Sequence, residues 1–79
     1  MLLYWGEHLA NPIELRSGAK LYTLLDAAHF VERGIPGPVR AEVFDTYTAL
    51  LQAARTGQAR DRQMATNALG AILISAELV

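Results

Sequence analysis

Apolar residues recur at helical spacing along the first long segment of the chain, from residue 12 to residue 33. One face of this segment would hold Ile13, Leu21, Leu24, Ala28 and Val31. Asn11 is a favourable N-cap, Pro12 suits the first helical position, and Gly34 suits the position just after a helix. The pattern predicts a helix over 12–33. It leaves open whether that helix breaks at Ser17-Gly18, where an interior glycine is unfavourable.

The second segment, from residue 38 to residue 55, has a clearer division between apolar and polar positions. Its apolar stripe consists of Val39, Val43, Tyr47, Leu50 and Ala54. Arg40, Glu42 and Asp45 lie mostly away from this stripe. The segment begins with Pro38 and is followed by Gly57, so an amphipathic helix over 38–55 is predicted.

The third segment, from residue 59 to residue 78, starts with polar residues and becomes apolar on nearly every side after Met64. A helix that is apolar all round is typically buried. A strand is the less favoured alternative for its last nine residues, because apolar and polar residues do not alternate there. We expect a helix with one apolar face left over after the core is filled.

The ten residues at the N-terminus, Met1–Ala10, fit either a short helix or an extended segment. Together these elements predict a single all-α domain over residues 1–79, built as a small bundle of three main helices with a short head. Short connections favour antiparallel neighbours in such a bundle.

Composition adds an argument for self-association. The chain has 79 residues, 52% of them hydrophobic, and no cysteine. A chain of this size buries a modest share of its surface, and disulfides cannot supplement its stability. The apolar surplus therefore favours a homodimer. No apolar stretch reaches the ~20 residues that a membrane-spanning helix needs, so we expect a cytoplasmic protein that does not insert into membranes.

The leftover apolar face predicts where a partner would bind, whether a second copy or an unidentified protein. The predicted interface residues are Tyr4, Trp5, Met64, Leu69, Ile72, Leu73, Ile74 and Leu78. Arg55, Arg60 and Arg62 cluster around the second interhelix loop and would form a polar rim.

One pair of residues suggests metal chemistry. Asp26 and His29 are three residues apart, which places a carboxylate and an imidazole on one helix face, and carboxylate-bundle metal proteins use a related spacing. Glu42 and Asp45 have the same spacing on the next segment. Such pairs arise often by chance, so an ordinary surface pair is the favoured interpretation. No nucleophile with a base and no phosphate-binding loop accompanies them, so we expect no enzyme and no cofactor.

The sequence therefore favours a small non-enzymatic interaction module, acting as an adaptor, inhibitor or regulatory subunit. Two alternatives stay open. One is a dimeric DNA-binding transcriptional regulator, suggested by the turn at 33–38, although two acids follow that turn and the net charge is −1. The other is a helical metal-binding protein that uses Asp26 and His29.

Overall fold

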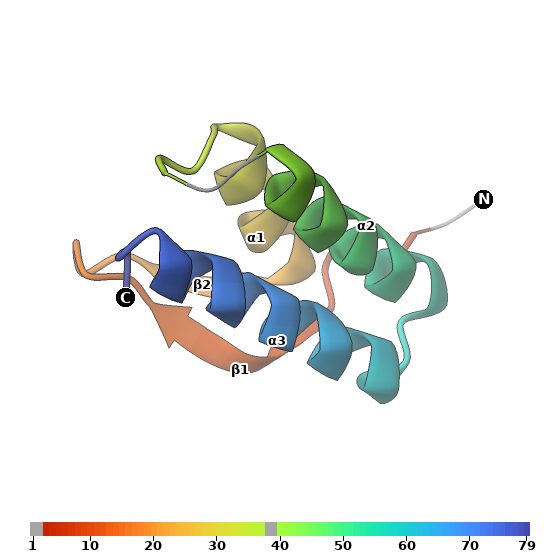
Figure 1. Ribbon diagram of the computed structural model, residues 1–79. Coiled ribbons are helices and arrows are strands. Elements are labelled where there is room, and N and C mark those ends of the chain that lie inside the picture. The colour runs from red at the N-terminus through yellow and green to blue at the C-terminus, as the bar shows by residue number, and fades with distance from the viewer. Residues whose placement is uncertain (1–2, 38–39) are drawn as a thin grey trace.

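The computed structural model describes residues 3–37 and 40–79, and it shows two strands followed by three helices (Figure 1). In chain order the elements are β1 (His8–Glu14), β2 (Lys20–Thr23), α1 (Leu24–Glu32), α2 (Arg40–Thr56) and α3 (Ala59–Ser75). The strands pair in antiparallel fashion. The fold therefore mixes helix and sheet, and the prediction of an all-α helical bundle is wrong.

The error lies in the segment predicted as one helix over 12–33. Asn11 and Pro12 do not begin a helix but lie inside β1. The sheet register is irregular between His8, which pairs with Thr23, and Ile13, which pairs with Leu21. Proline cannot donate a ladder hydrogen bond, so it is tolerated within such an irregular stretch of a short two-stranded sheet.

Ser17 and Gly18, where the sequence left open a break in the helix, instead form the turn of the hairpin. The Leu15 amide donates to the Ala19 carbonyl at 2.7 Å, and the Gly18 amide donates to the Leu15 carbonyl at 2.9 Å. Gly18 has a φ of +96°, a conformation that residues with a side chain rarely adopt. The glycine therefore reverses the chain here, and no helix passes through it.

Helix α1 begins at Leu24, twelve residues later than the sequence predicts. Thr23 is its N-cap, and the Thr23 hydroxyl accepts a hydrogen bond from the Asp26 amide at 3.1 Å. The Asp26 carboxylate accepts the Thr23 amide in return, which completes a capping box. The end agrees with the prediction, since Gly34 follows the helix with a φ of +91°.

The two long helices lie close to their predicted bounds. Helix α2 extends to Thr56, and Pro38 and Val39 of its predicted start lie outside the described residues. Helix α3 ends at Ser75 rather than residue 78. Glu77 adopts a φ of +58°, and the Leu78 amide donates to the Leu73 carbonyl at 2.9 Å. This reversal closes the helix and returns Leu78 toward the core.

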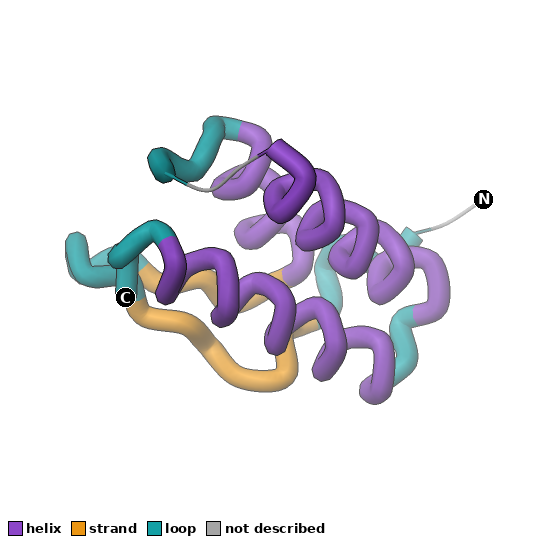
Figure 2. The backbone as a smooth tube through the Cα atoms, in the orientation of Figure 1, coloured by secondary structure: helices purple, strands orange, loops and turns teal. Residues whose placement is uncertain are grey.

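Figure 2 shows α2 and α3 as an antiparallel pair, with α1 behind α2 and β1 running below α3. Helix α3 packs against α2 on one side and β1 on the other, whereas α1 packs against α2 and β2. The core centres on four fully buried leucines, Leu24, Leu50, Leu69 and Leu73. Four fully buried alanines, Ala27, Ala53, Ala54 and Ala65, let the helices approach one another closely.

The head is irregular from residue 3 to residue 7, so it is not a helix; Met1 and Leu2 lie outside the described residues. Backbone hydrogen bonds hold it between helices. The Tyr4 amide donates to the Ala54 carbonyl of α2 at 2.6 Å, and the Leu25 amide of α1 donates to the Trp5 carbonyl at 3.0 Å. The head thus connects the first turn of α1 to the last turns of α2.

Candidate interaction surface

Helix α3 turns one face into the core and leaves the opposite face to solvent. The outward residues follow one another at intervals of four, three, four and three, which forms a continuous stripe along a helix. They are Arg60, Met64, Asn67, Ala71 and Ile74, and we call these five residues the α3 outer stripe. Met64 is 60% exposed and Ile74 is 67% exposed. Two large apolar side chains therefore stand in water on one helix face.

Three of the predicted interface residues lie on the buried face of the same helix. Leu69 and Leu73 are fully buried, and Ile72 is nearly so. They pack with Leu9 and Leu50 in the core of the single chain. Part of the apolar surplus that suggested an interface is therefore used by the fold itself, because the hairpin as well as α2 must be packed against α3.

The remaining predicted interface residues are divided between surface and core. Trp5 is half-buried, and its ring lies 6.5 Å from that of Tyr47. Tyr4 is half-exposed, and its ring lies so close to Gly57 that a Cβ there would come within 2.9 Å. Leu78 is half-buried against the core, and its carbonyl accepts the Arg16 amide at 2.6 Å. All three therefore have contacts within the chain.

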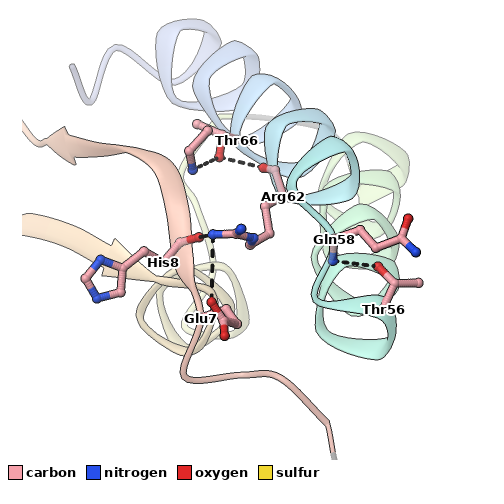
Figure 3. Close-up of polar contacts among 7 residues, drawn as sticks. Glu7, His8, Thr56, Gln58, Arg62 and Thr66 are labelled. Carbon is pink, nitrogen blue, oxygen red and sulfur yellow. Dashed lines mark hydrogen bonds and ion pairs between the residues drawn. The ribbon is translucent and has the colours of Figure 1, made fainter.

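Arg62, predicted as part of the polar rim, instead ties α3 to the strand β1 and the residue before it (Figure 3). Its guanidinium donates to the His8 carbonyl at 3.3 Å and lies 3.8 Å from the Glu7 carboxylate. One turn further on, the Thr66 hydroxyl donates to the Arg62 carbonyl at 2.7 Å and accepts the Ala10 amide at 2.9 Å. Arg62 and Thr66 of α3 thus bond to backbone groups of β1 that a further strand would otherwise pair.

The other two rim arginines stay at the surface. The Arg60 side chain is 81% exposed, and its Nε lies 3.8 Å from a carboxylate oxygen of Asp61. Asp61 is buried, and its carboxylate also accepts a hydrogen bond from the Thr56 hydroxyl at the end of α2. Arg55 is exposed in the last turn of α2. Arg60 is therefore a solvated cation at the first end of the α3 outer stripe.

The opposite end of the α3 outer stripe adjoins an acidic groove between α2 and α3. The groove has a volume of about 330 Å3. Its lining residues are Glu42, Asp45, Thr46, Ala68, Ala71, Ile72 and Ser75. From the sequence, Glu42 and Asp45 were considered for metal binding and as acids that disfavour DNA binding, and Asn67 and Ala71 were not selected as interface residues. The three- and four-residue spacing from Met64 to Ile74 is the sequence signal that could have identified Asn67 and Ala71.

Asp26 and His29, the metal candidates, line a separate groove of about 320 Å3 beside Lys20 and Arg33. The Asp26 carboxylate accepts the amides of Tyr22 and Thr23 at 3.1 and 3.2 Å. These hydrogen bonds, the one from Tyr22 first, lower the pKa of Asp26 below its ordinary 3.8. Within residues 3–37 and 40–79, no three histidine, cysteine, aspartate or glutamate side chains gather closely enough to hold a metal.

No protein-family model, curated protein or solved structure matches this chain. Among the described residues, none of the helices is long and apolar enough to cross a bilayer. The case for a function therefore depends on the surface of the molecule.

Proposed function

We propose that the protein is a non-enzymatic interaction module that binds through the α3 outer stripe. The observation that supports this proposal is the exposure of Met64 and Ile74 on the face of α3 that the chain's own core does not use. Removing apolar surface from water is favourable by about 25 cal/mol per Å2, so a matching surface gains free energy by covering these two side chains. A cytoplasmic location belongs to the same proposal, since a chain without cysteine needs no oxidising compartment.

The two alternatives have less support from the geometry. A DNA-binding regulator that reads bases with α2 would have to bring Glu42 and Asp45, both exposed in its first half, toward phosphates. A metal-binding protein that uses Asp26 and His29 would have to release the Asp26 carboxylate from two backbone amides. The first alternative would bring like charges together and the second would break two hydrogen bonds. Met64 and Ile74, in contrast, are exposed apolar side chains whose burial is favourable.

Capture of proteins from the native host tests the proposal. The bait is the full chain, compared with a Met64→Glu, Ile74→Glu double variant and with Phe44→Glu as the matched control. Phe44 is 69% exposed on a different helix, α2, so its substitution adds a charge to an equally exposed apolar site. We expect the double variant to lose its bound proteins and the control to keep them. Equal capture by the double variant and the wild type would refute the proposal.

A further inference from the structure

We infer that the occupant of the α3 outer stripe is a second copy of this chain, bound with the two α3 helices antiparallel. This inference rests on the proposed function and names its partner. The sizes of the stripe residues and the charges at the two ends of the stripe both favour this arrangement.

The apolar residues of the α3 outer stripe are self-complementary in the antiparallel direction. Met64 lies five residues before Leu69 and Ile74 lies five residues after it, about 7.5 Å away in each direction. A two-fold axis on the outer face, at the level of Leu69 along the helix, therefore sets Met64 against the partner's Ile74, and this contact occurs twice. Between these contacts, Asn67 faces the partner's Ala71, so a longer side chain meets a short one. A parallel pair would instead set Ala71 against the partner's Ala71 and leave a gap.

The charges at the ends of the stripe favour the same direction. Arg60 lies four residues before Met64, so in the antiparallel pair it reaches past the partner's Ile74 to the C-terminal end of the partner's α3. Glu42 and Asp45 lie beside that end in each copy, in the groove that includes Ser75. The last turn of α3 has no basic residue of its own, and Arg16 of the hairpin turn donates to the Val79 carbonyl beyond it. Arg60 would therefore meet two carboxylates and the negative end of a helix dipole.

The presence of both charges on one surface argues for a copy rather than a different protein. A partner of a single charge would match only one end of the stripe and oppose the other. Two-fold symmetry matches both ends at once, because each copy contributes an arginine at one end and two acids at the other.

Sedimentation of the full chain at micromolar to submillimolar concentration gives the first test. We expect the wild type and Phe44→Glu to sediment as dimers of about twice the 8.6 kDa chain mass. Met64→Glu and Ile74→Glu should each weaken the dimer at least about tenfold, as expected for an unpaired buried charge. A monomeric wild type, or a dimer that Phe44→Glu weakens equally, would overturn the inference.

Reversal of charge tests the ends of the stripe. Arg60→Glu alone and the Glu42→Arg, Asp45→Arg pair alone should each weaken the dimer several-fold, because like charges then face one another. The triple variant should recover most of the wild-type affinity, since opposite charges face again. If the loss of affinity in the triple variant equals the product of the two separate losses, Arg60 does not pair with the acids of the other copy, and the inference is contradicted.

Cysteine cross-linking tests the direction, and the natural chain has no cysteine to interfere. Met64→Cys mixed with Ile74→Cys should form a disulfide between the two different chains faster than either forms one with itself. Faster self-linking of each variant would show a parallel pair and overturn the inference. These tests are separate from the capture experiment, in which a monomeric protein could still lose its bound proteins when Met64 and Ile74 are changed.

Discussion

The hairpin with α1, residues 8–32, and the helical pair, residues 40–75, depend on different kinds of interaction. Strands β1 and β2 have seven and four residues, and a two-stranded sheet of this length is marginally stable alone. Leu9 is buried in the common core, and the Ala10 amide bonds to Thr66 of α3. Each helix of the pair has seventeen residues and an apolar face along its length. The hairpin is therefore held by the helical pair more than by its own pairing.

Truncation of a core side chain in the helical pair should cause the largest loss of stability, and it should destabilise both regions. Leu69→Ala removes a fully buried side chain from the core that the hairpin shares. We expect a loss of about 2–5 kcal/mol in the free energy of unfolding. Urea unfolding followed by circular dichroism and by the fluorescence of Trp5 should show one coincident transition. Separate transitions for the two probes would show that the regions fold independently.

Ile74→Ala is the matched control for Leu69→Ala. Ile74 belongs to the same helix but is 67% exposed, so its truncation should change the stability of the monomer by less than about 0.5 kcal/mol. The measurement belongs at the lowest usable protein concentration, where dimer formation does not add to stability.

Removal of the Arg62 contacts that join the two regions should cause the next largest loss of stability. Arg62→Met keeps much of the side-chain length but loses the hydrogen bond to the His8 carbonyl and the ion pair with Glu7. We expect a loss of about 1–3 kcal/mol, with hydrogen exchange rising more in residues 8–10 than in α2. Arg60→Met, at an exposed position two residues earlier, should leave exchange in both regions unchanged. A uniform rise in exchange would mean that Arg62 acts on the whole fold.

The same contrast explains what could be predicted from the sequence. The helices at 40–56 and 59–75 were predicted within a few residues because their apolar periodicity is long and their stop signals are local. The hairpin was missed because Ile13, Leu21 and Leu24 happen to fit a helical spacing, although Leu9, Ile13 and Leu15 also fit the two-residue period of a strand. Contacts with α3, distant in sequence, decide between these two periods.

The outward face of α3 was predicted only in part, for a related reason. Met64, Ile74, Leu69 and Leu73 were all selected because they are apolar residues of the C-terminal helix. The structure exposes Met64 and Ile74, whereas Leu69 and Leu73 are buried in the core. Periodicity alone assigns residues to faces and does not say which face is covered. The choice depends on how many elements pack against α3, and the sequence did not predict β1, whose residues were divided between the head and the helix predicted over 12–33.

Two glycine substitutions, one in each region, should change the free energy of unfolding in opposite directions. Gly18→Ala places a side chain at a φ of +96° in the hairpin turn and should cost about 1–2 kcal/mol. Gly70→Ala lies inside α3 with no atom within 4 Å of the new Cβ, and it should stabilise the protein by about 0.5–1 kcal/mol. Thermal and urea unfolding of both variants measure the difference. A stabilising Gly18→Ala would show that the turn does not fix the hairpin.

The smallest expected effect concerns the start of α1 and depends on pH. Hydrogen bonds from the Tyr22 and Thr23 amides lower the pKa of Asp26 below 3.8. A carboxyl with a lowered pKa in the folded state stabilises the fold fully above its unfolded pKa, and this contribution is lost as the pH falls through the folded pKa. Asp26→Asn should therefore cost a few tenths of a kcal/mol at pH 7, because the exposed carboxylate is screened by water. The difference between wild type and Asp26→Asn in urea midpoint should shrink as the pH falls below 3.8 and through the lowered pKa of the folded state. A difference that stays constant between these pH values would show that the charge of Asp26 contributes nothing to stability.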